Sequence, residues 1–255
     1  KSPTPPNRAR PPHDKCPQVL GDSIAIANFR GRAAPQDILL KDRDQHFWVY
    51  SHELELLWSG SCNTGHYPHP ADVDGDGRDE LYIGYSLFGS DGRKRWSLDD
   101  RIKDHADGVA VVDLDLDPAT PPVLLNAASD EGMIFLDTNA NILRHHYIGH
   151  VQNPSIANFR DDLPGLETYT INFWGNQGII HLFDARGELV FDFEPVGHGS
   201  MMVPVNWTGK SEEYFLLSAS SEEGGLFDGQ GRRVVRFPAD GHPQFASAAL
   251  DLTGD

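Results

Sequence analysis

The stretch IGHVQNPSIANF, residues 148–159, decides the fold that the sequence predicts. It passes from Gly-His through a turn into a short apolar strand, which ends at Asn158, a residue that suits a second turn. The same arrangement returns along the chain with its histidines 39 to 48 residues apart, and five of the 12 histidines occupy this one position. We therefore predict a structural repeat that presents an imidazole in each copy. The five histidines are His66, His105, His150, His198 and His242.

Each repeat carries four short apolar runs separated by polar turns, as in residues 109–113, 122–125, 132–136 and 142–148. Long runs with helical periodicity are missing, so few helices are expected. Four strands in about 40–48 residues are typical of one blade of a β-propeller. The sequence therefore predicts an all-β propeller of four-stranded antiparallel blades over residues 19–255. Its blades are expected at residues 19–60, 66–100, 105–148, 150–195 and 198–238, followed by the first strand of a sixth.

The turn between the third and fourth strands has the form Asp-x-x-Gly in residues 184–187 and 228–231. Asp accepts hydrogen bonds from nearby amides and Gly tolerates positive φ, so both suit a hairpin turn. The corresponding turn of the third repeat begins at Asp137 but has Ala140 in place of Gly. We predict that the turn there shifts onto Asn141.

Composition limits the partners. The net charge is −17, which disfavours a nucleic acid, and an acidic glycan would need locally placed Arg or a bound cation. No run of 18 apolar residues predicts a membrane span. Cys16 and Cys62 fit no metal-binding spacing, and their pairing stays open. Residues 1–18, rich in Pro and basic residues, are expected to be an extended lead-in. Since the sixth repeat stops after one strand, we expect an incomplete ring, completed by the missing remainder of the same polypeptide.

The topology of a blade places the histidines. The first strand is innermost, and the loop before it lies on the same face of the propeller as the loop between strands two and three. The five imidazoles are therefore expected to converge on one channel mouth, where imidazole can bind a metal or move protons. The alternative is that each His only hydrogen-bonds a backbone carbonyl. The same face is expected to carry Asn153, Asp107 and Trp174. Trp174 is flanked by Asn172, and an aromatic ring beside amides is common where proteins bind sugars. The alternative for Trp174 is packing between blades.

The string DVDGDGRDEL, residues 72–81, is the most specific local motif. Carboxylates at alternate positions on a Gly-hinged loop suit Ca²⁺, although the loop is not an EF-hand. The alternative is a network of Asx turns without metal. We predict a structural calcium site on the face opposite the histidines, with the candidate ligands Asp72, Asp74, Asp76, Asp79 and Glu80.

The acidic string, the repeated Gly-His positions, and the phrases PGLE and GRRVVRFP resemble the β-propeller polysaccharide lyases, the rhamnogalacturonan lyase group in particular. The resemblance covers residues 19–255. It implies a ring of seven or eight blades, calcium dependence, and a cleft at the channel mouth. It also implies that a His or Tyr moves protons while a cation or Arg neutralises a uronate. No Arg falls on the His face in a motif that matches this pattern.

The leading hypothesis is a lyase that cleaves uronic-acid-containing glycans by β-elimination, with His105 and His150 moving protons. An extracellular or periplasmic location is expected. The alternative is a non-catalytic carbohydrate-binding or adhesion propeller like the FG-GAP repeats, in which DxDGDG also occurs. A hydrolase ranks last because no carboxylate pair spans two blades. The expected substrate-binding residues are His66, His198, His242, Asn153, Asp107, Trp174 and Asn172. The three histidines among them, with Asn153 and Asp107, are also candidate metal ligands.

Overall fold

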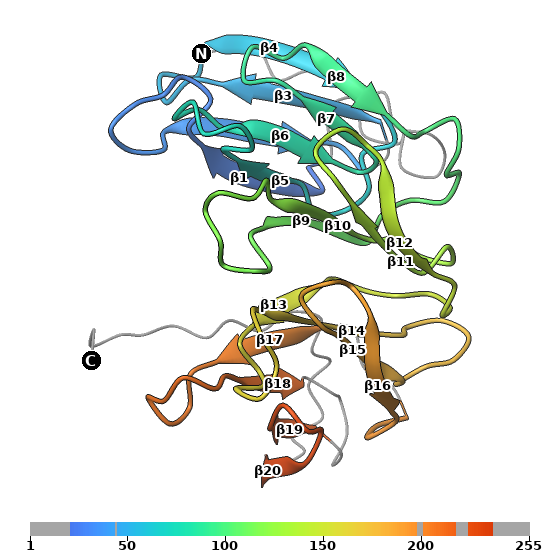
Figure 1. The fold of residues 1–255 in the computed structure, drawn as a ribbon. Coiled ribbons are helices and arrows are strands. Elements are labelled where there is room, and N and C mark those ends of the chain that lie inside the picture. Colours follow the sequence, from blue (N-terminus) through green and yellow to red (C-terminus); the bar gives the residue numbers. More distant parts are fainter. Residues whose placement is uncertain (1–20, 44, 198–200, 218–223, 237–255) are drawn as a thin grey trace. The chain divides into compact units, whose positions relative to one another are not determined.

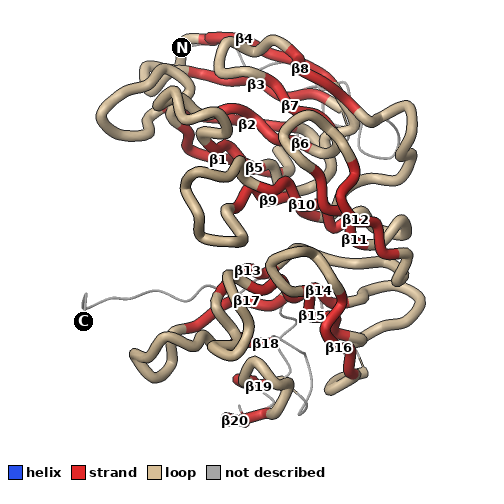
Figure 2. Tube along the Cα trace, in the orientation of Figure 1, coloured by secondary structure: helices blue, strands red, loops and turns tan. Residues whose placement is uncertain are grey.

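The computed structural model describes residues 21–43, 45–197, 201–217 and 224–236. These residues form β-strands and no helix, so none of them offers a helix that could cross a membrane (Figures 1 and 2). The strands make five separate four-stranded sheets, each from four strands that are consecutive in the chain. The predicted all-β fold of four-stranded antiparallel blades is therefore confirmed.

The strand bounds follow the predicted apolar runs closely. The first sheet is β1 (Ser23–Ala27), β2 (Asp37–Lys41), β3 (His46–Tyr50) and β4 (Leu56–Ser61); the second is β5 (His69–Ala71), β6 (Glu80–Ile83), β7 (Ser86–Phe88) and β8 (Lys94–Ser97). The third is β9 (Gly108–Val112), β10 (Val123–Ala127), β11 (Met133–Leu136) and β12 (Ile142–His146). The fourth is β13 (Ser155–Ala157), β14 (Glu167–Ile171), β15 (Ile180–Phe183) and β16 (Leu189–Phe193); the fifth is β17 (Met202–Val205), β18 (Tyr214–Leu217), β19 (Gly225–Phe227) and β20 (Arg233–Arg236).

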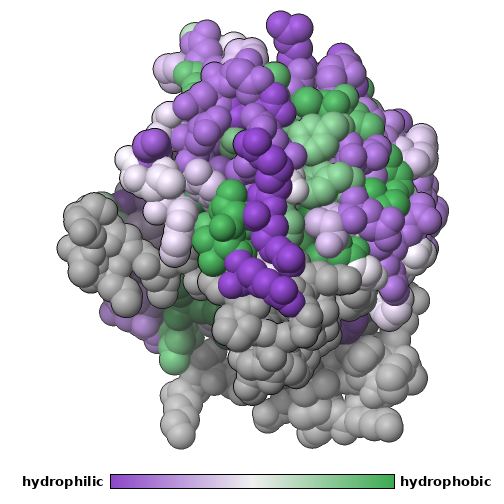
Figure 3. All heavy atoms as spheres, turned by 90° about the horizontal axis from the view of Figure 1, so that it is seen from below, coloured by the Kyte–Doolittle hydropathy of each residue, from purple (hydrophilic) through white to green (hydrophobic). Residues whose placement is uncertain are grey.

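The chain divides into two compact units, and the division passes through the third sheet. The first unit holds the first two sheets together with β9 and β10, and the second unit holds the fourth and fifth sheets. On the face in Figure 3, hydrophilic and apolar residues are interspersed. The predicted lead-in at residues 1–18 and the sixth repeat from His242 lie outside the described residues.

The core of the first unit lies between its first two sheets. Phe47 of β3 and Phe88 of β7 are buried with ring centroids 4.9 Å apart, and Phe47 also meets Trp58 of β4 edge to face at 5.9 Å. All four residues of β6 and all three of β7 are buried, whereas the outer strand β8 is mostly exposed. Each buried aromatic contributes about 1.5–3 kcal/mol through removal of its apolar surface from water. The central strands are therefore mostly apolar, because both of their faces are covered.

The core of the second unit is an aromatic cluster between the fourth and fifth sheets. Tyr169 of β14 lies 4.9 Å from Phe159 and 4.7 Å from Phe215 of β18, measured between ring centroids. The Tyr169 hydroxyl donates to the carbonyl of Gly229 at 2.9 Å, so its polar end is satisfied inside the core. The two sheets are therefore joined by apolar packing and by the hydrogen bond from the Tyr169 hydroxyl of one sheet to the turn of the other.

The Asp-x-x-Gly turns form as predicted. Asp184 accepts from the amides of Arg186 and Glu188, each at 2.9 Å, and Asp228 makes the corresponding bonds in the fifth sheet. The predicted shift in the third sheet is wrong. Ala140 itself takes the left-handed conformation, with φ of 67°. The Asp137 carboxylate accepts from the backbone and side-chain amides of Asn141, at 2.9 and 2.7 Å, which holds Ala140 in place.

Three of the sheets place a buried acid at the first position of the second strand: Asp37, Glu80 and Glu167. Each accepts a backbone amide from the turn after the first strand of the same sheet. Glu167 accepts two, from Phe159 at 2.8 Å and Arg160 at 2.9 Å. Glu80 accepts one from Val73, and Asp37 one from Arg30. The acid thus satisfies turn amides that no strand partner reaches.

A second recurring bond links one sheet to the next. In the second, fourth and fifth sheets, the residue before the second strand donates its N–H to a carbonyl just after the first strand of the preceding sheet. Asp79 donates to Asn28 at 3.1 Å, Leu166 to Leu114 at 2.7 Å, and Glu213 to Asn158 at 2.7 Å. We call this bond the inter-sheet latch. In two of the three latches the acceptor is the Asn that follows the first strand, so this residue opens a turn and also lies where the next sheet attaches.

Candidate functional site

Two of the predicted histidines come together in the first unit. The rings of His66, before β5, and His105, before β9, are perpendicular, with centroids 5.1 Å apart. Both approach Asp107: its Oδ1 lies 3.6 Å from His105 Nε2 and 4.0 Å from His66 Nε2. Asp107 is buried, while His105 is 42% exposed and His66 21% exposed in their side chains. We call His66, His105 and Asp107 the imidazole cluster.

The backbone holds the cluster together. The His66 amide donates to the Ala106 carbonyl at 2.9 Å, so the loop before β5 lies directly against the loop before β9. Gly65 makes this approach possible: it has φ of 59°, and a Cβ there would lie 2.4 Å from the Ala106 oxygen. Asn63 adds a second link, with its side-chain amide donating to the Asp104 carbonyl at 2.7 Å. The Gly-His pair of the repeat is therefore a device for close loop contact as well as a source of imidazole.

Two residues that were not among the predicted site residues extend the cluster. His66 Nδ1 lies 3.2 Å from the Asp22 carboxylate, and the same Asp22 oxygen lies 2.7 Å from Lys41 Nζ. The Lys41 side chain is fully buried at the end of β2. A buried ammonium is tolerated only when it is paired, so Lys41 fixes the position of Asp22 and thereby the orientation of His66. Asp22 occupies the place where the first repeat lacks a His.

Charged neighbours shift the pKa values of His105 and Asp22 in opposite directions. The hydrogen bond with Asp107 and the nearby Asp104, whose Oδ1 lies 2.9 Å from His105 Nδ1, raise the pKa of His105 to about 8 despite its partial burial. Burial works to raise the pKa of Asp22, but the hydrogen bonds from His66 and Lys41 outweigh it and the pKa is lowered. At neutral pH His105 is therefore an imidazolium, and the neighbouring Asp22 is ionised.

An arginine lies next to this end of the first unit. Arg43 belongs to the loop between β2 and β3 and is exposed. Its carbonyl accepts from the Thr64 hydroxyl at 3.4 Å, two residues before His66. The topology of the blade predicts that the loop KDRDQH, residues 41–46, lies on the His face, but no recognised motif distinguishes Arg43 within it.

His150 lies in the second unit with partners of its own. Its Nδ1 is 2.7 Å from Asp130 Oδ1, and the Ser129 hydroxyl lies within 3.3 Å of the ring nitrogens. The ring is buried, with 8% exposure. His105 and His150 therefore belong to different units. His198 and His242 lie outside the described residues.

The other predicted residues of the second unit occupy the two loops near His150. Asn172 is fully buried, and its amide donates to the Ile148 carbonyl at 2.7 Å, which holds the Gly149 loop in place. The side-chain oxygen of Asn153 is buried and has no partner among the described residues. Trp174 is 57% exposed, and its ring meets Phe173 edge to face at 4.7 Å. Trp174 thus leaves most of its ring accessible to a ligand.

The acidic loop, residues 72–80, is at the opposite end of the second sheet from His66, since it follows β5 whereas His66 precedes it. Oxygens of Asp72, Asp74 and Glu80 lie within 4.8 Å of one another, which is a fitting oxygen donor set for Ca²⁺. A competing cation is already present: Arg95 Nη2 lies 2.8 Å from Asp74 and 2.9 Å from Glu80.

The other carboxylates of the acidic loop bind backbone. Asp72 accepts the amides of residues 75, 76 and 77, and Asp76 accepts the amide of Arg78. Asp79 accepts the Asn28 amide at 2.6 Å. Ca²⁺ would therefore have to draw Asp74 and Glu80 away from Arg95 and would share Asp72 with the turn.

No protein-family model and no curated protein matches the sequence. Among solved structures, the exotype rhamnogalacturonan lyase YesX is similar, with a TM-score of 0.67 and 21% identity over 89% of this chain and 40% of that one. A Bacillus licheniformis rhamnogalacturonan lyase has a TM-score of 0.63 and 18% identity over 89% of this chain and 39% of that one. The V. cholerae biofilm matrix protein Bap1 has a TM-score of 0.61 and 14% identity, covering 86% and 63%.

The chain spans less than half the length of these two lyases. At such identities the likeness shows the propeller fold and no more. The resemblance expected from the sequence is therefore supported in its fold, while the reaction has to be argued from the side chains.

Proposed function

We propose that the protein is a polysaccharide lyase that cleaves uronic-acid-containing, rhamnogalacturonan-like glycans by β-elimination. The observation that carries the proposal is the imidazole cluster: two histidines from neighbouring repeats share one buried carboxylate at the end of the sheets where the repeat presents its histidines. Turn-making alone does not require a second imidazole beside the first.

The reaction has three requirements. A base removes the proton at C5 of the uronate, the electron pair forms a C4=C5 double bond, and the C4–O4 bond breaks as O4 takes up a proton. The proton at C5 is acidic only because it is adjacent to the carboxylate, and the developing enolate must meet positive charge. The base and the acid must each lie within hydrogen-bond reach of their atoms.

The cluster has groups suited to each requirement. His105, with a pKa of about 8, is protonated at neutral pH and suits proton donation to O4. His66 is oriented through Nδ1 by Asp22, which leaves Nε2 available for the C5 proton. Arg43, whose backbone carbonyl accepts from Thr64 near His66, is the proposed cation for the uronate carboxylate. His150, held by Asp130, remains a second proton-handling candidate in the other unit.

A divalent cation is the other use of the same residues. His66, His105 and Asp107 bring ligand atoms within 4.8 Å of one another. Bound there, a metal would supply the charge that the enolate requires. His66, His105 and Asp107 would then hold the metal.

The test is to incubate the full-length protein with pectic and other uronate-containing glycans and follow the ultraviolet absorbance of the new double bond. His105→Ala and His66→Ala should each lower the rate by about 10²–10⁴-fold, the range for loss of a general acid or base. His52→Ala is the matched control, since His52 lies in the exposed turn after β3. Full activity in both variants, or no absorbance with any glycan, would remove the assignment.

The second candidate is a non-catalytic carbohydrate-binding or adhesion propeller. The exposed ring of Trp174 supports it, as does the fold that the chain shares with a biofilm matrix protein. Such a protein would bind acidic glycans without creating absorbance. Binding would then depend on Trp174 and be unaffected by His105→Ala.

A further inference from the structure

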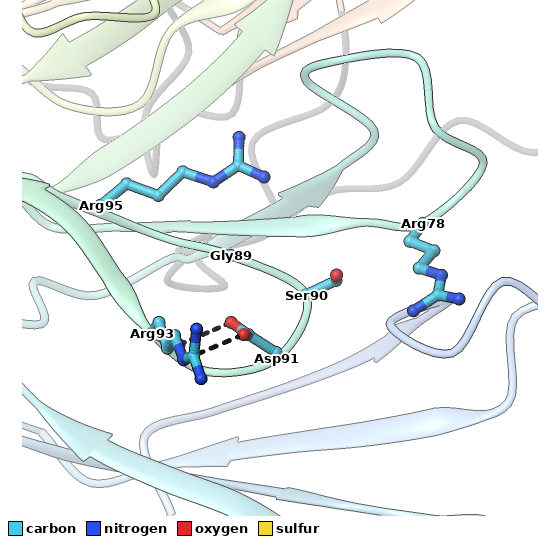
Figure 4. A pocket seen from close by; sticks show the side chains of 6 residues that line it. All are labelled: Arg78, Gly89, Ser90, Asp91, Arg93 and Arg95. Carbon is cyan, nitrogen blue, oxygen red and sulfur yellow. Dashed lines mark hydrogen bonds and ion pairs between the residues drawn. The ribbon is translucent and has the colours of Figure 1, made fainter.

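A pocket of about 380 Å³ lies in the first unit, away from the imidazole cluster. Arg78, Arg93 and Arg95 line it together with the turn residues Gly89, Ser90 and Asp91 (Figure 4). Arg78 comes from the acidic loop after β5, and the others come from the turn after β7 and from β8. Both turns are at the end of the second sheet opposite His66. We call this the arginine pocket.

The gathering of three arginines in one pocket is unusual for this chain. Lys and Arg total 21 against 38 Asp and Glu, and the net charge of −17 repels anions at long range. An anionic ligand therefore needs local donors, and guanidinium groups provide them with a geometry that matches a carboxylate.

The pocket retains hydrogen-bond donors. The Arg78 guanidinium and the Ser90 hydroxyl make no hydrogen bond or ion pair with another described residue. Arg95 uses Nη2 for both Asp74 and Glu80, so its Nε and Nη1 donors remain. Arg93 has a loose contact with Asp91, at 3.3 Å, and is 89% exposed in its side chain.

The walls are held in place without a ligand. Gly92 closes the turn after β7 with φ of 81°, and the Trp58 ring lies so close that a Cβ there would be 2.8 Å from it. The stem of Arg78 lies against Gly31, where a Cβ would be 3.1 Å from Arg78 Cγ. Arg95 is fixed by the buried Glu80. The backbone of the pocket and Arg95 are therefore ordered before binding, and the ordering cost falls on the side chains of Arg78 and Arg93.

We propose that the arginine pocket is a second carbohydrate-binding site, which holds the carboxylate of an acidic sugar unit. The volume fits this ligand better than a bare inorganic anion, since 380 Å³ is in the range of small-molecule sites. A free anion such as sulfate shares the charge chemistry and is the competing source. The proposal does not depend on the lyase reaction, because the pocket and the imidazole cluster are at opposite ends of the second sheet.

The experiment titrates the full chain with trigalacturonate, with a neutral glucose trisaccharide and with sodium sulfate. The amide chemical shifts of Ser90 and Gly92 provide a local readout that binding elsewhere does not move. Trigalacturonate should shift both amides in a saturable way and the neutral trisaccharide should not. Arg78→Ala and Arg93→Ala should each raise Kd about tenfold, as expected for loss of one charge-assisted hydrogen bond.

Matched variants separate this site from the imidazole cluster. Arg186→Ala removes an exposed arginine from the corresponding turn of the fourth sheet and should leave Kd unchanged. His105→Ala should also leave Kd unchanged, so a failed lyase assay and a failed pocket are distinguishable. The proposal is overturned if the neutral trisaccharide binds equally, if only sulfate binds, or if the Arg78→Ala, Arg93→Ala double variant keeps the wild-type Kd.

Discussion

Glu167 offers a sharp test of how the sheets are held, because burial and hydrogen bonding act on it in opposite directions. The residue is fully buried at the start of β14, and one carboxylate oxygen accepts the amides of Phe159 and Arg160. The other oxygen, Oε1, has no partner among the described residues. Burial dominates and raises the pKa of Glu167 from 4.5 to about 7, while the two amides lower it in part.

The sign follows from linkage. An acid whose pKa is higher in the folded state stabilises the fold at low pH, and this stabilisation is lost as the pH rises from 4.5 to about 7. A shift of that size is equivalent to about 3.4 kcal/mol in full, and to about 2.5 kcal/mol between pH 5 and pH 8. Glu167→Gln removes the titration and keeps an oxygen for the two amides.

The assay is urea unfolding of the wild type and Glu167→Gln from pH 5 to pH 8. The variant is expected to be less stable at pH 5, because its NH₂ group meets no acceptor at the Oε1 position. It should gain about 2.5 kcal/mol on the wild type by pH 8, since only the wild type pays for burying a charge. Glu53→Gln, in an exposed turn, is the control and should show no such trend. A constant difference between wild type and Glu167→Gln would refute the reasoning, because it would mean that the two amides fully offset burial.

Three further outcomes are expected. Ala140→Gly should stabilise the chain by about 1 kcal/mol, measured by thermal unfolding, because Ala140 holds a left-handed φ that costs an L-residue this much; an unchanged or lower melting temperature would contradict the turn geometry. Asp107→Asn should lower the pKa of His105 from about 8 toward 6.5, because Asp107 is the main cause of the raised value. The pKa is measured from the chemical shifts of the imidazole protons, and an unchanged pKa would show that Asp107 does not act on His105. Asp74→Ala should cost about 0.5–1 kcal/mol, since the pair with Arg95 is partly exposed. EDTA should mimic it if calcium binds the acidic loop, with turnover per folded molecule unchanged; lost turnover at equal stability would contradict a structural role.

The fold was predictable because its signals are local. Apolar runs of strand length alternate with Asp and Gly turns, and these fix most of the strands within a residue or two. The third strand of the second sheet, β7, was harder to see, because only Gly84 and Tyr85 separate it from β6 and the two read as one apolar run. The left-handed conformation of Ala140 was not predicted because alanine disfavours it, and here the hydrogen bonds between Asp137 and Asn141 impose it.

The candidate site was predictable in part. The repeat spacing located His66, His105 and His150, because the spacing of histidines is a property of the sequence. The pairing of Lys41 with Asp22 could not be predicted from the sequence. A lysine at the end of a strand normally reaches solvent, and only tertiary packing buries this one. Asp130 and His150 are 20 residues apart in the sequence and meet through a contact between two loops, which no local pattern encodes.

The inter-sheet latch has a consequence for how such chains grow in evolution. Donor and acceptor of each latch come from different repeats, and the fourth sheet carries one of each: the Asn158 carbonyl after its first strand and the Leu166 amide before its second. A copy of that repeat would therefore bring both halves with it and could be joined to a further copy of itself without redesign of the contact. The attachment is also directional, head to tail, as a series of like units requires. Duplication can thus change the number of repeats while each imidazole, carried on the loop before the first strand, is free to diverge.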